Sequence, residues 1–176
     1  MSNQTVYLAR HATPDWSRKD IPYDIPPGPP LTDLGEAEAV KLGRFLAEAG
    51  VIQIFASPLE RTQRTAAIAA QGLEIPITTV DAIAEWRHGE SEEAVLGRAH
   101  AFWQERFEAS PLTGPSALVS HGGPIRLLLE MLSGDPARIA EYLPRFDHHN
   151  PLPPAGVWRA QRQDDGSWQV ELVFTP

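Results

Sequence analysis

Short apolar runs and longer segments with helical spacing follow one another along this chain. Four of the runs predict strands: Thr5 to Ala9, Val51 to Ala56, Ile77 to Val80 and Ala117 to Ser120, the last of which looks the most buried. Nearer the C-terminus, residues 157–163 and 168–174 are strand-like and flank Asp164-Asp165-Gly166, which predicts a closing hairpin.

Cap residues predict where the first two helices begin and end. Thr32 can cap a helix from Asp33 to about Ala49, and Gly50 follows as a stop. Ser57-Pro58-Leu59-Glu60 has the form of a capping box with proline at the first helical position. It predicts a second helix that runs to about Gln71.

Three more helices and two loops complete the predicted order of elements. Ser91 caps the third helix, the fourth runs from Pro124 to near Gly134, and Asp135-Pro136 caps a shorter fifth. The loop from Ala12 to Leu31 holds six prolines and is long for a compact domain, which indicates a functional or mobile segment. A second loop, Asp81 to Glu90, starts apolar and turns charged.

Three of the predicted strands end at residues that carry chemistry. The first runs into Arg10-His11, the second into a segment that contains Arg61, and the fourth into His121-Gly122. Ligands of open α/β sheets bind in the crevice outside the carboxyl ends of the strands. We therefore expect one pocket that holds two histidines and two arginines.

This combination of side chains suits chemistry at phosphorus. A neutral imidazole nitrogen is a nucleophile, and guanidinium groups neutralise phosphoryl oxygens with paired hydrogen bonds. A loose phosphoryl transition state needs mainly positioning and positive charge. A single histidine at a strand end is more often a hydrogen-bonded structural residue, but three matching junctions favour phosphoryl transfer.

Composition narrows the class of protein. With 176 residues and 42% hydrophobic content, the chain suits one domain spanning residues 1–176. No apolar run has the length of a membrane span and no secretion signal is evident, so we expect a cytoplasmic protein. The lack of cysteine excludes disulfides and thiolate zinc sites, and the net charge of -8 argues against a nucleic-acid partner.

Four motifs now indicate a family. In chain order they are Arg10-His11, Leu31-Thr32-Asp33-Leu34-Gly35, Ser57-Pro58-Leu59-Glu60-Arg61-Thr62 and Val119-Ser120-His121-Gly122-Gly123-Pro124-Ile125-Arg126. Together they resemble the histidine phosphatase superfamily, which includes the cofactor-dependent phosphoglycerate mutases. The resemblance implies a three-layer α/β sandwich, with a mostly parallel central sheet and helices on both faces. It also implies a phosphohistidine on His11, with the phosphoryl group held by Arg10, Arg61, His121 and the backbone N–H of Gly122.

The general acid is placed by the same resemblance. The family carries a carboxylate after its third strand in a pattern like Leu-x-Glu, and Ala82-Ile83-Ala84-Glu85 is the best match. Glu85 is therefore the expected acid. The alternative is a solvated glutamate like its neighbours Glu90, Glu92 and Glu93.

Departures from the family pattern bear on activity. Ala12 replaces the glycine usual after Arg-His, which is harmless only if its φ is below zero. Thr13, Pro14 and Ser17 replace residues that contact phosphate in many members. The interval from Glu85 to Ser91 is short where mutases carry a large insertion, which favours a phosphatase.

The sequence thus predicts a phosphomonoesterase that uses no metal or cofactor and acts on a small phosphorylated substrate. A mutase that returns the phosphoryl group to a second hydroxyl remains an alternative, as does a non-catalytic module that binds a phosphorylated ligand. His148-His149 lacks a third spaced ligand and indicates a polar loop rather than a metal site, and His100 is expected to be structural. Four further residues either border the pocket or pack its rim: Trp16, Trp86, Arg87 and His88.

Overall fold

A six-stranded sheet forms the centre of the computed structural model, which describes residues 4–109 and 113–176. The strands are β1 (Thr5–Arg10), β2 (Gln53–Ala56), β3 (Ile77–Thr79), β4 (Ser116–Ser120), β5 (Val157–Arg162) and β6 (Trp168–Phe174). Their order across the sheet is β3-β2-β4-β1-β5-β6. β1 to β4 run parallel, whereas β5 is antiparallel to both β1 and β6. The predicted mostly parallel sheet and its closing hairpin are confirmed.

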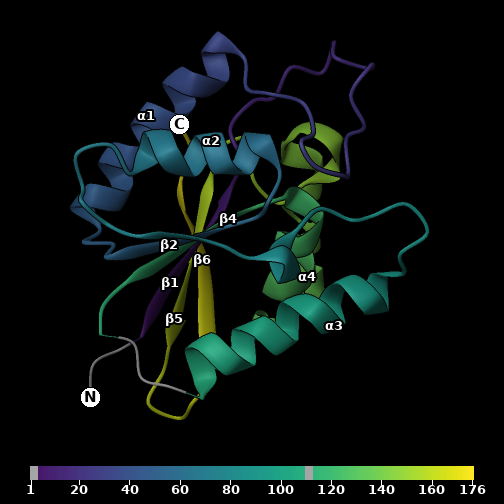
Figure 1. Cartoon of the computed structure of the whole chain (residues 1–176). Coiled ribbons are helices and arrows are strands. Elements are labelled where there is room, and N and C mark those ends of the chain that lie inside the picture. The colour runs from purple at the N-terminus through teal and green to yellow at the C-terminus, as the bar shows by residue number, and fades with distance from the viewer. Residues whose placement is uncertain (1–3, 110–112) are drawn as a thin grey trace.

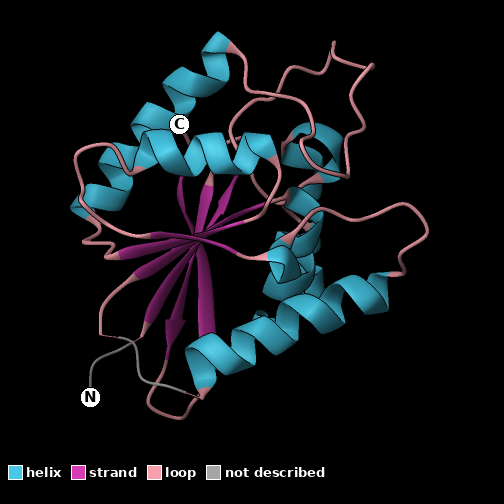
Figure 2. Ribbon diagram, viewed as in Figure 1, coloured by secondary structure: helices cyan, strands magenta, loops and turns pink. Residues whose placement is uncertain are grey.

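Helices cover both faces of this sheet (Figures 1 and 2). α1 (Asp33–Glu48) and α2 (Glu60–Ala69) pack on one face. α3 (Glu92–Trp103), α4 (Gly122–Ser133) and the short α5 (Pro136–Ala140) belong to the other. The three-layer sandwich is therefore as predicted. Within the described ranges, no helix combines the length and apolarity needed to cross a bilayer.

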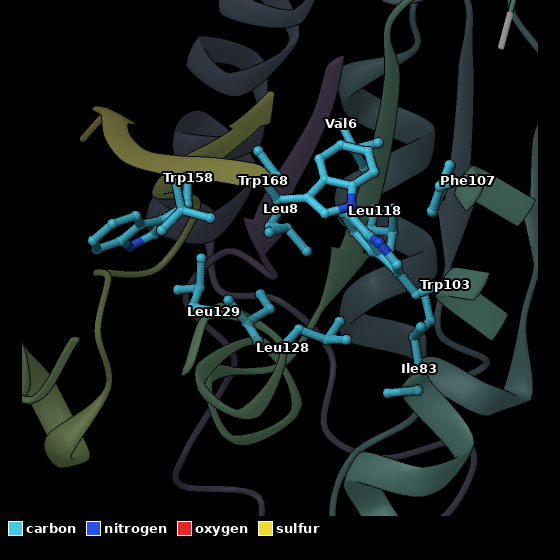
Figure 3. Packing of buried hydrophobic residues seen from close by; sticks show 14 of the residues in the cluster. Val6, Leu8, Ile83, Trp103, Phe107, Leu118, Leu128, Leu129, Trp158 and Trp168 are labelled. Carbon is cyan, nitrogen blue, oxygen red and sulfur yellow. The ribbon is translucent and has the colours of Figure 1, made fainter. Parts of the chain in front are cut away.

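The alternation of side chains along β1 explains why both faces are covered. Val6 and Leu8 point to the α3 and α4 layer and pack with Trp103 and Trp158 (Figure 3). Tyr7, between them, points to the α1 and α2 layer. Each large apolar side chain buried in this way contributes about 1.5–3 kcal/mol, so a central strand with two apolar faces requires helices on both.

Local signals set most helix ends. The Thr32 hydroxyl accepts a hydrogen bond from the N–H of Gly35 at 3.0 Å, and the Ser91 hydroxyl accepts one from Ala94 at 3.2 Å. Gly134 ends α4 in a left-handed conformation, with φ of 62°. These three predicted caps are confirmed.

The predicted capping box at Ser57 is wrong. α2 begins at Glu60, and its N-cap residue Leu59 makes no side-chain cap hydrogen bond. The Ser57 hydroxyl lies instead 2.7 Å from Nε2 of His121. The N–H of Glu60 donates to the carbonyl of Pro27 at 2.7 Å. Contacts distant in sequence thus replace the local cap.

The start of α4 also differs from the prediction. The helix begins at Gly122, two residues before the predicted start at Pro124. The backbone N–H groups of the first helical turn have no intrahelical partner. The longer helix therefore brings Gly122 and Gly123, with their free N–H groups, to the end of β4.

Candidate active site

The register of the sheet brings the two histidines together. Arg10 at the end of β1 pairs with Ser120 at the end of β4, so the next residues, His11 and His121, emerge side by side. The N–H of His11 donates to the carbonyl of Ser120 at 2.9 Å. The chain leaves β1 toward α1 on one face and leaves β4 directly into α4 on the other. This is a topological switch point, where open α/β sheets bind ligands.

A cavity of about 350 Å³ opens at this edge. Its lining is Arg10, His11, Trp16, Tyr23, Glu85, Trp86, Gly122, Gly123, His148 and Asn150. Arg61 and His121 are fully buried and do not line the cavity themselves. Both lie next to Glu85, which does line it. Oε2 of Glu85 lies 3.3 Å from Nη2 of Arg61 and 3.4 Å from Nδ1 of His121. All six predicted site residues are therefore gathered in one place.

His11 is held as a neutral base. Its Nδ1 lies 2.8 Å from the carbonyl oxygen of Ala12, and because a carbonyl only accepts, Nδ1 carries the proton. Burial, and then the charges of Arg61 and Arg10, lower the pKa of His11 well below its usual value. No hydrogen bond among the described residues engages Nε2. That nitrogen therefore offers an unprotonated lone pair.

His121 faces His11, with ring centroids 5.2 Å apart. Burial, followed by the charge of Arg61, lowers the pKa of His121 well below its usual value, so the ring is neutral. When the Ser57 hydroxyl donates to Nε2, at 2.7 Å, the ring proton sits on Nδ1. Nδ1 is buried without a hydrogen-bond partner in the described structure and lies on the side of Glu85. A neutral His121 is thereby able to donate one N–H to a bound oxygen.

Arg10 is fixed by a carboxylate that sequence analysis missed. Nη1 and Nη2 donate to the two oxygens of Asp147, at 2.6 and 2.8 Å, and Nη1 also donates to the carbonyl of Leu152 at 3.2 Å. Such a paired arrangement locks the plane of the guanidinium group. The side chain is only 2% exposed, and its Nε has no partner among the described residues.

Arg61 is fixed by the long proline-rich loop. Nη1 donates to the carbonyl of Tyr23 at 2.8 Å, and the guanidinium carbon lies 3.9 Å from the centre of the Tyr23 ring. Its Nε is also buried without a partner in the described part of the chain. Buried polar groups are normally satisfied, so the Nε–H groups of Arg10 and Arg61 are suited to donate to an anionic group at this site.

Glu85 is not the solvated glutamate of the alternative interpretation, because its side chain is only 14% exposed. Its Oε1 accepts a hydrogen bond from the N–H of Trp86 at 2.9 Å. Burial raises the pKa of Glu85, although the N–H of Trp86 and the charge of Arg61 oppose this effect. A carboxyl group with a raised pKa keeps its proton closer to neutral pH.

Arg98 of α3 holds the loop that carries Glu85, and sequence analysis missed this residue too. It donates to the carbonyls of Ala82, Ala84 and Glu85 at 2.8, 2.9 and 3.0 Å. It also forms a paired interaction with Glu90, at 2.7 and 3.0 Å. Hydrogen bonds from Arg98 lower the pKa of Glu90 to about 2, so Glu90 stays ionised while Glu85 is pushed toward the protonated form.

A family model described as "Histidine phosphatase superfamily (branch 1)" matches residues 6–94 and 86–173. The chain belongs to the histidine phosphatase superfamily. A curated relative from Cronobacter sakazakii, named "Probable phosphoglycerate mutase GpmB", is 30% identical in an alignment of 165 positions that covers 75% of this chain and 76% of that protein.

Solved structures show the same fold. A mycobacterial glucosyl-3-phosphoglycerate phosphatase has a TM-score of 0.76 and 18% identity, covering 96% of this chain and 98% of that one. The YhfR protein of Bacillus stearothermophilus also has a TM-score of 0.76, with 19% identity and 96% of both chains covered.

The charge of the site in this member of the histidine phosphatase superfamily favours an anion over a metal ion. Ligand atoms of His11, Glu85 and His121 lie within 4.8 Å of one another, close enough to hold a cation. However, Arg10 and Arg61 lower the pKa of both histidines through their charge, and the same charges oppose a metal cation. These donors therefore suit a phosphoryl group better.

The segment after His11 departs from the family pattern without distorting the site. Ala12 does not have a positive φ, so its side chain causes no strain there. Thr13 donates to Glu38 through both its N–H and its hydroxyl, at 2.8 and 3.0 Å, and does not line the cavity. Ser17 is likewise engaged with Asp15. This loop instead contributes Trp16 and Tyr23 to the cavity.

The other histidines follow the sequence interpretation in part. His148 lines the cavity, but the metal-capable group found among the described residues includes neither His148 nor His149. Both adopt a left-handed backbone, with φ of 51° and 54°. Arg87 and His88 line a neighbouring depression, so of the four rim candidates only Trp16 and Trp86 reach the cavity itself.

Proposed function

We propose that this protein hydrolyses a phosphate monoester in two steps, through a phosphohistidine on His11. The observation that carries the proposal is the neutral His11, whose Nε2 is free and whose ring is close enough to two buried arginines for their charges to lower its pKa. Nε2 attacks phosphorus and the bond to the ester oxygen breaks, while Glu85 gives its proton to the leaving oxygen. Water then attacks phosphorus, Glu85 takes back a proton, and the bonding pair returns to Nε2.

The phosphoryl oxygens meet donors from three elements. Arg10 and Arg61 supply positive charge, and Nδ1 of His121 supplies a neutral N–H. The backbone N–H of Gly122 lies in the first turn of α4, where free N–H groups and the helix dipole attract anions. Donors that are fixed before the substrate arrives stabilise the transition state without reorganising.

A phosphoglycerate mutase activity is the second candidate, because the curated relatives carry that name. A mutase of this kind has to hold a substrate with a second anionic group. Among the residues that line the cavity, Arg10 is the only arginine or lysine. That lining has no further guanidinium or ammonium group for a second phosphate or carboxylate, which supports hydrolysis over transfer to a second hydroxyl.

The proposal is tested with para-nitrophenyl phosphate. We expect hydrolysis that persists after treatment with a chelator, because Arg10 and Arg61 supply the charge that a metal would otherwise provide. Vanadate, a phosphate mimic, should inhibit. A rate that collapses on chelation and returns with zinc or magnesium would contradict the metal-independent mechanism. Turnover that requires a bisphosphate primer would instead establish the mutase.

Arg98→Met tests whether the loop clamp positions Glu85. The variant keeps the apolar stem but loses every donor to the loop, and displacement of a catalytic group by about 1 Å costs up to about 10²-fold. We expect kcat on an alkyl phosphate to fall by about that factor, with a much smaller fall on para-nitrophenyl phosphate. Arg159→Met, which removes an exposed ion pair with Glu171, is the matched control. Equal losses on both esters would contradict a positioning role.

A further inference from the structure

Aromatic rings surround the mouth of the cavity. Trp16, Tyr23 and Trp86 line it together with the imidazole of His148. Trp16 is stacked on Tyr23, with centroids 5.4 Å apart and an angle of 16° between the planes. Tyr23 in turn covers the guanidinium of Arg61 at 3.9 Å. The guanidinium of Arg61 and the rings of Tyr23 and Trp16 are thus stacked in sequence from the phosphoryl site to the rim. At the rim, Trp16 is 41% exposed.

The two tryptophans are held in place before any ligand binds. The ring of Trp16 contacts the rings of Tyr23 and His148, with centroids 5.4 and 5.0 Å away. The indole N–H of Trp86 donates to the carbonyl of Glu90 at 2.6 Å, and Glu90 is itself clamped by Arg98. Rings fixed in this way lose little conformational entropy when a ligand packs on them.

Trp86 lies where the leaving group has to pass. An in-line displacement places the leaving oxygen opposite His11 and within reach of Glu85. Trp86 is the next residue, and its N–H holds Oε1 of Glu85. A methyl group placed on Gly123 would lie 3.6 Å from Trp86 and 3.9 Å from that oxygen, so no side chain fills this space.

The arginines around the mouth are already paired and disfavour a second anion on the substrate. Arg10, the one arginine or lysine of the lining, is already paired with Asp147. Arg87 belongs to the neighbouring depression that shares Tyr23 and Trp86, and it donates to Asp81 at 2.6 Å. The space beyond Glu85 is therefore aromatic and lacks a free guanidinium.

We propose that this space is a subsite for a planar, uncharged ring carried by the leaving alcohol, which packs against Trp16 and Trp86. The inference rests on the proposed hydrolysis and adds the class of substrate: a monophosphate ester of a ring-bearing alcohol with no other anionic group. Stacking on an aromatic side chain tolerates many ring types, because every flat ring presents a π-face.

Phenethyl phosphate and cyclohexylethyl phosphate test the subsite. Both are alkyl esters of similar size and apolarity, so they differ mainly in the flatness of the ring. We expect kcat/KM to be about tenfold higher for phenethyl phosphate, in line with one stacked ring. Para-carboxyphenethyl phosphate should be a poorer substrate than phenethyl phosphate, since its carboxylate finds no partner.

Two variants locate the effect. Trp16→Leu and Trp86→Leu should each reduce the preference for the flat ring by several-fold, mainly through KM. Ile25→Ala is the control, because Ile25 lies in the same loop as Trp16, is 48% exposed and does not line the cavity. Thermal unfolding of each variant checks that the fold is retained.

The outcomes separate this inference from the proposed function. Hydrolysis of both esters at equal kcat/KM, or a preference that survives both tryptophan substitutions, would overturn the subsite alone. A preference for the carboxylated ester that is lost in Arg87→Ala would assign an anionic substrate instead. No hydrolysis of any ester and no phosphorylated His11 would overturn the proposed function itself.

Discussion

His11→Ala should abolish both hydrolysis and the phosphorylated form of the protein. Removal of an attacking nucleophile costs far more than removal of any single donor, so we expect kcat to fall by at least about 10⁴-fold. The wild-type protein, quenched during turnover, should carry a phosphoryl group that is stable in base and lost in acid, as expected of a phosphoramidate. Quenched-flow labelling followed by peptide mapping measures both effects.

His100→Ala is the matched control, since His100 lies within α3 and outside the cavity. It should retain the activity and the label. A label that survives in His11→Ala, or that maps to His121, would contradict the assignment of the nucleophile. When Ser57 donates to Nε2 of His121, the Nδ1 that lies near Glu85 carries the ring proton, so a label on His121 would require a change of tautomer or a turn of the ring.

Those parts of the site that lie at strand ends could be predicted from the sequence. Arg10, His11 and His121 follow directly on buried strands, and parallel strands place their carboxyl ends at the same edge of a sheet. The register of β1 and β4 then determines the contact between the two histidines. This inference requires only the apolar runs and the direction of the strands.

The residues that orient this centre could not be predicted in the same way. Asp147 is 137 residues away from Arg10 and lies in a connector without periodic pattern. Tyr23 engages Arg61 partly through its carbonyl, which every residue possesses. Arg98 has the appearance of any arginine on an amphipathic helix. Such contacts depend on the paths of the loops across the end of the sheet. Those paths are determined by packing between residues far apart in the sequence.

Ser57 shows why the local prediction failed. A helix cap and a buried hydrogen bond each contribute about 1 kcal/mol, so local sequence alone does not decide between them. Once β2 and β4 are paired, Ser57 lies beside His121 and its hydroxyl has a partner at 2.7 Å. The tertiary contact then determines the role of the side chain, and α2 begins three residues later.

Glu85→Gln should slow the hydrolysis of alkyl phosphates far more than that of para-nitrophenyl phosphate. An alkoxide must be protonated as it leaves, and a positioned acid contributes about 10²–10⁴-fold. Glutamine keeps the shape of the side chain but has no acidic proton, so kcat on phenethyl phosphate should fall by this factor. The nitrophenolate is already a stable anion and needs little help. Steady-state kinetics on both esters measures the difference.

The pH dependence gives an independent readout. Burial raises the pKa of Glu85, and a general acid acts only while protonated. Activity of the wild-type protein on alkyl phosphates should therefore fall as the pH rises through that pKa. Glu85→Gln should lose this alkaline limb. Glu93→Gln, which changes an exposed glutamate in the first turn of α3, should leave both the rates and the pH profile unchanged.

The environments of nearby carboxylates make Glu85 the best candidate for this role. Arg98 lowers the pKa of Glu90 to about 2, and hydrogen bonds from Ser17 lower the pKa of Asp15. Neither group carries a proton at neutral pH, whereas burial raises the pKa of Glu85 and favours its protonated form. Neighbouring carboxyls whose pKa values are driven apart have different roles. Equal losses on both esters in Glu85→Gln would assign Glu85 a binding role, because a binding contact does not depend on the basicity of the leaving oxygen.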